Sequence, residues 1–194
     1  MGIRGVIFDM DGTITAPYLE FAKFKAVAGI GNVDTLDYLR SATGREYERV
    51  HGLLMKFEEG GVANAKLNRG ARTLLNYLRR QRIPMALLTR NSRKSVNGVC
   101  EKLNLKFDAV FTREDGPHKP APEPIWEIAA RWKLKRRELL MVGDYKWDVL
   151  CARNAGIRSA VLITDNEIPV WAEGADFIIR RLSELVPIIE GKTS

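Results

Sequence analysis

The chain alternates between short apolar runs and longer segments in which apolar residues recur at helical spacing. The first run, residues 3–8, predicts a buried strand because it is too short for a helix and is bounded by glycines. Further apolar runs predict strands at residues 85–88, 109–111, 139–142, 159–163 and 177–179. Strands that alternate with helices predict an α/β fold with a doubly wound, mostly parallel sheet.

Helices are predicted between these strands from their apolar stripes and from the residues that start or stop them. Asn68 is expected to cap a helix whose core face lies within residues 71–78. Ser92 is expected to open the next helix, which runs to about residue 103. Gly156 is expected to end the helix that follows residue 145, because glycine favours the conformation found after a helix C-terminus.

Residues 18–66 contain helical patterns and no strand pattern. Val50, Leu54 and Phe57 keep the spacing of one helical face, whereas residues 60–64, with the sequence GGVAN, predict a hinge or loop. We therefore expect two units. An α/β core comprises residues 1–17 and 67–194, and a small all-helical cap of residues 18–66 is inserted after the first strand.

Composition and charge narrow the class of protein without identifying it. The 194 residues carry a formal charge of +7, with basic residues scattered and no RNA-binding or zinc-finger motif, which favours anionic small substrates over nucleic acid. Cys100 and Cys151 lack metal or redox spacing, and no apolar run approaches the length of a membrane span. We expect a soluble, cytoplasmic protein with neither nucleic-acid nor membrane partners, and the sequence leaves its oligomeric state open.

Two carboxylates, Asp9 and Asp11, follow the first predicted strand directly. A turn or capping pair is the alternative, but acidic groups at the exit of a buried strand are costly unless a cation or a reaction uses them. Ligands of open α/β sheets bind outside the carboxyl ends of the strands, where both residues would lie. One carboxylate could attack phosphorus while the other transfers protons, and Gly12 would let backbone N–H groups approach phosphoryl oxygens.

Three further polar signals follow other predicted strands or precede a helix: Thr89, Lys119, and Asp144 with Asp148. Taken alone, each has a structural explanation. Thr89 could cap a helix, and Lys119 could be an exposed lysine. Asp144 and Asp148 could be a helix N-cap and a first-turn acid. In a parallel sheet, however, these positions converge on one edge. Carboxylates there suit Mg²⁺, and a hydroxyl and an ammonium group suit a transferring phosphoryl group.

These residues resemble the motifs of the haloacid dehalogenase-type (HAD) hydrolase superfamily, most of whose members are Mg²⁺-dependent phosphatases. The match comprises DMDGT at residues 9–13, Thr89, Lys119-Pro120 and Gly143-Asp144 with Asp148, in the family's order across the core. The helical segment after the first strand is similar to the family's cap, here short. The phosphoglycolate-phosphatase-like branch is the nearest relative that the motifs suggest, and the resemblance implies a Rossmann-like core.

The resemblance also implies the roles of the acidic residues. Asp9 would be the nucleophile that forms an aspartyl-phosphate, and Asp11 would be the acid and base. Mg²⁺ would be held by the Asp9 carboxylate, the backbone carbonyl of Asp11 and Asp144, with Asp148 in support.

Other residues are assigned to the phosphoryl group or mark departures from the family. Thr89 and Lys119 would bind phosphoryl oxygens, with Lys119 also holding the nucleophile in place. Arg90 either meets a substrate carboxylate or covers the surface. Tyr145 stands where the family often has serine, and it either narrows the site together with Trp147 or packs beneath it, which is the interpretation we favour.

The predicted function is therefore an Mg²⁺-dependent phosphatase that acts on a small phosphorylated metabolite. One alternative is a phosphomutase or phosphotransferase acting on a sugar phosphate; related hexose-phosphate mutases carry a histidine soon after the first motif, and residues 14–49 contain none. The other alternative is a non-catalytic binding module that kept the fold. The intact set of carboxylates, threonine and lysine argues against it. Charged cap residues such as Lys25 and Glu58 could either set substrate specificity or face solvent, so the sequence does not identify the substrate.

Overall fold

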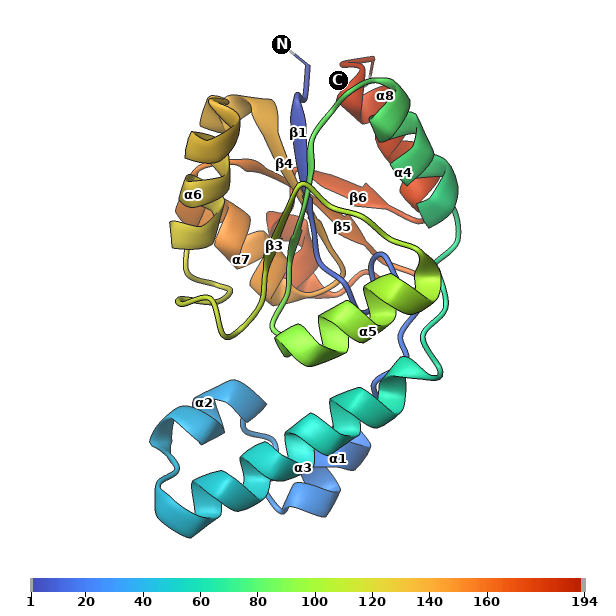
Figure 1. Ribbon diagram of the computed structural model, residues 1–194. Coiled ribbons are helices and arrows are strands. Elements are labelled where there is room, and N and C mark those ends of the chain that lie inside the picture. The colour runs from blue at the N-terminus through green and yellow to red at the C-terminus, as the bar shows by residue number, and fades with distance from the viewer. Residues whose placement is uncertain (1, 193–194) are drawn as a thin grey trace.

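A computed structural model describes residues 2–192, and a six-stranded parallel sheet lies at its centre (Figure 1). The strands run in the order β3-β2-β1-β4-β5-β6. In the central strand, Val6 pairs with Met85 of β2 on one side and Leu140 of β4 on the other. The strands are β1 Gly5–Phe8, β2 Met85–Leu88, β3 Ala109–Phe111, β4 Leu139–Gly143, β5 Arg158–Leu162 and β6 Phe177–Ile179. The predicted doubly wound α/β sheet is confirmed, with β5 shifted by one residue from its predicted position.

Helices cover both faces of the sheet because its central strands are apolar on both sides. Successive side chains of a strand point to opposite faces, so Val6 and Phe8 pack in one core cluster while Ile7 packs in the other. The first face carries α4 (Ala71–Arg80), α5 (Arg93–Leu103) and α8 (Leu185–Ile189), and the second carries α6 (Glu123–Trp132) and α7 (Lys146–Ala155). Short 3-10 helices lie at Arg136–Glu138, Val170–Gly174 and Leu182–Glu184.

Three helices, called the cap helices below, lie between β1 and α4: α1 (Phe21–Ala28), α2 (Thr35–Ser41) and α3 (Gly44–Val62). They share a hydrophobic cluster, distinct from those of the sheet, that includes Phe24, Val50 and Leu54. Figure 1 shows them at the end of the molecule opposite to the two chain termini. The boundaries of a separate cap at residues 18 and 66 stay a prediction.

The predicted hinge or loop at residues 60–64 is wrong for its first part, because α3 continues to Val62. A Cβ atom on Gly61 would overlap the side chain of Leu19 and lie 3.2 Å from the ring of Tyr18. This glycine therefore permits close packing of α3 against the segment that leads into α1, and it does not make a turn. The sequence pattern concealed this role because Leu19 is distant along the chain.

The predicted helix cap at Asn68 is also wrong. Helix α4 begins after Gly70, whose φ of 85° lies in the left-handed region that favours glycine. Asn68 Nδ2 instead donates a hydrogen bond to the backbone carbonyl of Gly12, 3.0 Å away. The side chain thereby ties the linker that returns from the cap helices to the loop that follows β1.

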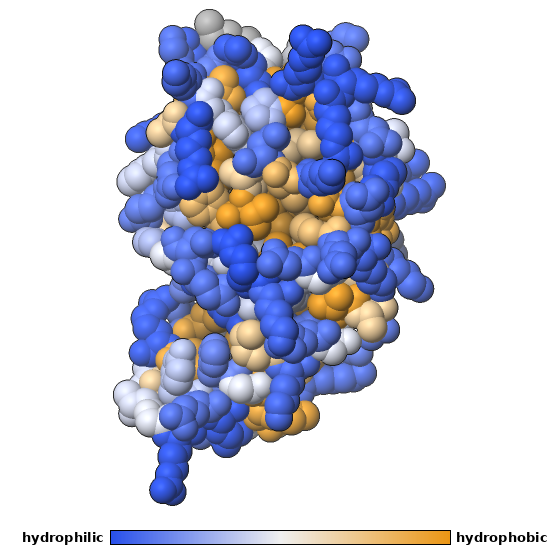
Figure 2. All heavy atoms as spheres, viewed as in Figure 1, coloured by the Kyte–Doolittle hydropathy of each residue, from blue (hydrophilic) through white to orange (hydrophobic). Residues whose placement is uncertain are grey.

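Most of the surface seen in Figure 2 is hydrophilic. Apolar side chains show mainly between α4 and α6, over the sheet edge that β3 forms. Among the helices of residues 2–192, none combines the length and the hydropathy needed to cross a bilayer.

Candidate active site

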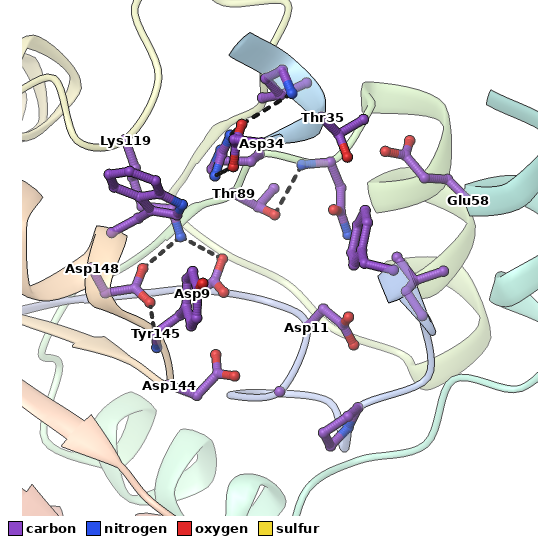
Figure 3. A pocket seen from close by; sticks show the side chains of 18 of the residues that line it. Asp9, Asp11, Asp34, Thr35, Glu58, Thr89, Lys119, Asp144, Tyr145 and Asp148 are labelled. Atoms are coloured by element: carbon purple, nitrogen blue, oxygen red, sulfur yellow. Dashed lines mark hydrogen bonds and ion pairs between the residues drawn. The ribbon is translucent and has the colours of Figure 1, made fainter. Parts of the chain in front are cut away.

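The strand order reverses between β1 and β4, and the predicted acidic residues meet at this point. In doubly wound sheets, ligands bind in the crevice at such a switch point, outside the carboxyl ends of the strands. Asp9 directly follows β1, and Asp144 directly follows β4. Figure 3 shows their carboxylates beside that of Asp148, and all three residues line one cavity.

Lys119 supplies an ammonium group to this cluster. Its side chain is only 3% exposed, and Nζ lies 2.6 Å from Oδ1 of Asp9 and 2.6 Å from Oδ1 of Asp148. Burial alone would lower the pKa of the Lys119 ammonium, but the carboxylates of Asp148 and Asp9 raise it above its usual range. Lys119 is therefore no surface lysine: it stays charged and fixes the positions of two carboxylates.

Glycines let the aspartates of the cluster approach the backbone closely. A Cβ atom on Gly12, whose φ is 81°, would overlap the Asp144 carboxylate, and a Cβ atom on Gly143 would overlap that of Asp148. Thr13 Oγ1 donates a 2.9 Å hydrogen bond to Oδ1 of Asp144. Glycine is therefore needed at positions 12 and 143, because any larger residue would displace a carboxylate.

The alternative explanation of Asp144 as a helix N-cap is wrong, because Tyr145 occupies that position of α7. Asp148 does act as a first-turn acid, since its Oδ2 accepts a hydrogen bond from the backbone N–H of Tyr145 at 3.1 Å. The same carboxylate also pairs with Lys119 through its other oxygen. The structural and functional interpretations of Asp148 are therefore compatible.

The acidic cluster fits a divalent cation. One oxygen from each of Asp9, Asp144 and Asp148 lies within 4.8 Å of the others. Burial and the charges of Asp9 and Asp148 raise the pKa of Asp144 well above its usual value. One ammonium group faces three carboxylates, and a divalent cation would balance the excess negative charge. Carboxylate oxygens are the protein ligands that Mg²⁺ prefers, so the donor set matches this ion.

Asp11 lies apart from the other three carboxylates. Its Oδ1 accepts a 3.2 Å hydrogen bond from the backbone N–H of Tyr18, and Figure 3 shows its side chain directed away from Asp9. Burial raises the pKa of Asp11 to about 7, opposed by the N–H of Tyr18 and helped by repulsion from Asp9. A carboxyl group with this pKa exchanges its proton near neutral pH, which suits general acid and base catalysis. A metal contact through its backbone carbonyl stays a prediction.

Thr89 follows β2 directly and lies at the same cavity. It is 2% exposed, and its Oγ1 accepts a 3.2 Å hydrogen bond from the backbone N–H of Asn91. Its own O–H group can still donate to a ligand. The cavity has a volume of about 420 Å³ and extends from the carboxylates to the cap helices, where Lys25 and Leu54 line it.

Arg90 contacts the cap helices, which neither of its two sequence-based interpretations foresaw. Its Nη1 lies 3.0 Å from Oδ2 of Asp34, the N-cap residue of α2, and its side chain is 20% exposed. The guanidinium group also lies 5.5 Å from the ring centre of Trp147. Arg90 therefore joins the core to the cap helices, and direct contact with a substrate stays a prediction.

Tyr145 and Trp147 form part of the cavity wall. Tyr145 is 48% exposed, and its ring contacts the ring of Trp147 edge-on at a centroid distance of 6.5 Å. Both residues line the cavity. Their place in the cavity wall favours the other interpretation, that they narrow the site, which stays a prediction.

Glu58 of α3 lines the site and does not face solvent, which was one of the two possibilities that the sequence left open. It is 1% exposed, forms an ion pair with the nearly buried Arg113, and accepts a 3.1 Å hydrogen bond from the backbone N–H of Ser92. One signal was available: Glu58 follows Leu54 by one helical turn, on the apolar face of α3. An acid on such a face needs a buried partner, but the pattern does not say which residue provides it.

Comparison with known proteins finds relatives in sequence and in fold. Residues 16–162 match the family model for haloacid dehalogenase-like hydrolases. A haloacid dehalogenase-like hydrolase domain-containing protein of Arabidopsis thaliana is 28% identical over an alignment of 206 positions, which covers 97% of this chain and 84% of the relative. The pyrophosphatase PpaX of Bacillus cereus is 32% identical over 117 residues, spanning 58% of this chain and 54% of the relative. The crystal structure of a hydrolase from Pseudomonas syringae shares the fold, with a TM-score of 0.82, 22% identity, and coverage of 98% of this chain and 100% of its own.

Proposed function

Because the chain belongs to the haloacid dehalogenase-like hydrolase family, we propose that it is a phosphatase that hydrolyses a small phosphomonoester through a phosphorylated Asp9. The observation that carries this proposal is the contact between Asp9 and the buried Lys119 beside a second acidic pair, with Asp11 held apart. This arrangement separates a nucleophile from a proton donor and places the ammonium group of Lys119, which can bind phosphate, beside the nucleophile. The name of the related pyrophosphatase supports phosphoryl chemistry as the reaction class.

In the first half-reaction, a carboxylate oxygen of Asp9 attacks the phosphorus of the ester. The bond between phosphorus and the ester oxygen breaks as the new bond forms, and Asp11 gives its proton to the departing oxygen. Asp9 is then an aspartyl-phosphate, and Asp11 is a carboxylate. Lys119 and the hydroxyl of Thr89 donate hydrogen bonds to the phosphoryl oxygens while they carry increased negative charge.

In the second half-reaction, the Asp11 carboxylate takes a proton from a water molecule, whose oxygen attacks the phosphorus. The bond between phosphorus and the Asp9 oxygen breaks, and inorganic phosphate leaves. Asp9 is again a carboxylate, and Asp11 is again protonated. One residue thus serves as acid and then as base, which a pKa of about 7 permits near neutral pH.

Asp9, Asp144 and Asp148 would hold a Mg²⁺ ion, together with the backbone carbonyl of Asp11. The bound ion supplies positive charge that offsets the repulsion between the carboxylates and the phosphate group.

We assign residues 18–66 to a cap that covers this site. Two contacts bring the linkers on either side of the segment together: the Ala16 backbone N–H donates to the carbonyl of Lys66 at 2.9 Å, and Thr15 forms a β-bridge with Leu67. The cap residues that line the cavity would exclude water and contact the leaving group, as closing elements do in other enzymes.

The purified protein is expected to release inorganic phosphate from p-nitrophenyl phosphate and from members of a panel of phosphorylated metabolites when Mg²⁺ is present. A colorimetric phosphate assay with and without a chelator measures this release. If a phosphate isomer forms instead of free phosphate, detected by phosphorus NMR, the protein is a phosphomutase. If phosphate esters bind without turning over, it is a binding module.

Mg²⁺ is expected to raise the midpoint of thermal unfolding, and to raise it more near pH 8 than near pH 6. Burial raises the folded-state pKa of both Asp144 and Asp148 above that of an unfolded aspartate, and for Asp148 it raises the pKa to about 6. Such a group stabilises the fold while it is protonated, and this contribution is lost as the pH rises through the folded-state pKa. Because Mg²⁺ takes the place of the proton, it restores more stability where the site is deprotonated. Scanning fluorimetry at both pH values measures the shifts.

Asp144→Asn is the matched control for this measurement. It removes one of the clustered charges and keeps an oxygen that accepts the hydrogen bond from Thr13. The variant is expected to be more stable than the wild type near pH 8 without metal, and to respond less to Mg²⁺. An equal Mg²⁺ response in wild type and variant would contradict the assigned metal site.

A further inference from the structure

The loop of residues 89–92, called the β2 loop below, is contacted by two of the cap helices. The side chain of Arg90 pairs with Asp34 of α2. Two residues further along the loop, the backbone N–H of Ser92 donates a 3.1 Å hydrogen bond to Oε2 of Glu58 in α3. The position of this core loop therefore depends on where the cap helices lie.

Arg113 holds the β2 loop from the core side. It lies two residues after β3, its side chain is 8% exposed, and its guanidinium group pairs with Oε1 of Glu58. Nη1 of Arg113 also donates a 3.4 Å hydrogen bond to the backbone carbonyl of Arg90, and the backbone N–H of Arg113 donates to the carbonyl of Asn91 at 3.3 Å. Glu58 and Arg113 together thus bind backbone groups of three successive loop residues.

A carboxylate is the group that fits at position 58, because both of its partners are donors. One oxygen of Glu58 faces the guanidinium group of Arg113, and the other faces the N–H of Ser92. The amide of a glutamine would present an NH₂ group to one of these donors and leave it unpaired. Figure 3 shows the Glu58 carboxylate directed from α3 toward the middle of the site, where it is almost fully buried.

Stability alone does not account for this buried ion pair. Removing two charges from water is costly, and apolar residues of similar volume often stabilise a fold as well or better. What apolar side chains at positions 58 and 113 would not supply are the hydrogen bonds to the β2 loop. Those bonds fix the orientation of the loop relative to the carboxylates.

The hydroxyl group of Thr89 is oriented by the same loop. Its Oγ1 accepts a 3.2 Å hydrogen bond from the backbone N–H of Asn91, whose neighbours on either side are the residues that Arg113 and Glu58 bind. This contact uses an acceptor position of the hydroxyl and leaves its proton free to donate. A movement of the loop would therefore turn the hydroxyl away from the phosphoryl group.

We propose that Glu58 and Arg113 are positioning residues that hold the β2 loop in the form in which Thr89 binds the phosphoryl group. The inference rests on the proposed phosphatase function and makes phosphate binding dependent on the docking of α3. Glu58 also lines the cavity, so direct contact between its carboxylate and the leaving group is the competing arrangement.

The test measures the Kd for inorganic phosphate by calorimetry with Mg²⁺ present, and kcat/KM for p-nitrophenyl phosphate and a panel of alkyl phosphates. Glu58→Gln is expected to raise the phosphate Kd about 3- to 30-fold, the range over which a single contact changes the coupling between two sites. It is expected to lower kcat/KM by at least the same factor for every ester, whatever the leaving group. Direct contact with the leaving group would instead give losses that differ between esters.

A double-mutant cycle with Thr89→Val shows whether Glu58 acts through Thr89. Valine keeps the shape of threonine and removes the hydroxyl group. In the Thr89→Val background, Glu58→Gln is expected to change the phosphate Kd by less than about 2-fold, because the hydroxyl that it misplaces is already absent. A purely structural role for Glu58 would give the same factor in both backgrounds.

Glu59→Gln is the matched control, since it makes the same chemical change at the next residue of α3. Glu59 also pairs with a core residue, Lys94 of α5, at 2.8 Å, but this pair is exposed and Glu59 does not line the cavity. Exposed ion pairs contribute little, so the phosphate Kd is expected to stay at the wild-type value.

Glu58→Gln is expected to lower the thermal midpoint, because the guanidinium group of Arg113 stays buried without its counter-ion. All Kd values are therefore compared well below the midpoints. If Glu58→Gln does not fold, Arg113→Lys takes its place. It keeps a charge beside Glu58 but loses the forked group that also reaches the carbonyl of Arg90, and a rise in Kd of about 3-fold is expected.

An unchanged phosphate Kd, or equal factors in the two Thr89 backgrounds, would overturn the inference and leave the phosphatase function intact. An unchanged Kd with losses of kcat/KM that differ more than about 10-fold between esters would assign Glu58 to the leaving group instead. If the wild type binds phosphate but turns over no ester, the proposed function fails, and the Kd values still decide the role of Glu58. A wild type that neither binds phosphate nor turns over an ester removes both.

Discussion

Asp9→Asn is expected to abolish phosphate release, lowering kcat by roughly 10⁶-fold, the scale of losing a covalent nucleophile. An amide does not attack phosphorus, so the first half-reaction stops. The fold is expected to persist, because asparagine has the shape of aspartate and still offers an oxygen to Nζ of Lys119, which lies 2.6 Å from Oδ1 of Asp9. Turnover of p-nitrophenyl phosphate by wild type and variant, each at saturating Mg²⁺, measures the loss.

Asp165→Asn provides the comparison for this variant. Asp165 is exposed and does not line the cavity, so the same chemical change is expected to leave turnover as it is in the wild type. If Asp9→Asn retained activity within about 10-fold of the wild type, the nucleophile would lie elsewhere.

Asp11→Asn is expected to lower kcat by about 10²- to 10⁴-fold, the usual contribution of a general acid and base. The loss is expected to depend on the leaving group in the first half-reaction. An alkyl phosphate needs a proton on the departing oxygen, whereas p-nitrophenolate leaves without one. In the wild type, kcat/KM for an alkyl phosphate is expected to fall as the pH rises through about 7, where Asp11 loses its proton. The variant is expected to lack this decline.

The half-reactions of Asp11→Asn can be separated in a stopped-flow experiment with p-nitrophenyl phosphate. A burst of p-nitrophenolate close to the enzyme concentration is expected, followed by slow turnover, because the variant forms the phosphorylated enzyme but activates water poorly. Equal losses for aryl and alkyl esters without a burst would contradict a proton-transfer role for Asp11.

The meeting of the acidic residues was predictable because strand geometry alone determines it. Asp9 and Asp144 each follow an apolar run directly, and the carboxyl ends of neighbouring parallel strands lie at one edge of the sheet. The position of Lys119 was harder to predict, because this residue lies in a loop and single lysines are mostly exposed. Only its order among the other motif residues pointed to the site, and the structure shows it almost fully buried between Asp9 and Asp148.

Contacts between segments that are distant in sequence were not predictable. Gly61 was interpreted from local propensity as part of a hinge. Glycine is needed there because the side chain of Leu19 leaves no room for a Cβ atom. Asn68 was interpreted as a cap, but it binds the carbonyl of Gly12. The ion pair of Arg90 with Asp34 depends on how the cap helices sit on the core, and hydrophobic periodicity carries no information about that orientation.

The most direct test of the account is chemical trapping of the phosphorylated enzyme. Asp11→Asn is mixed with p-nitrophenyl phosphate and Mg²⁺, quenched in acid, and reduced with borohydride, which converts an aspartyl-phosphate into homoserine. Mass spectrometry of the tryptic peptide of residues 5–23 then locates the change. The account predicts homoserine at position 9. Homoserine at another position, or unmodified Asp9 in an enzyme that has released a burst of p-nitrophenolate, would contradict it.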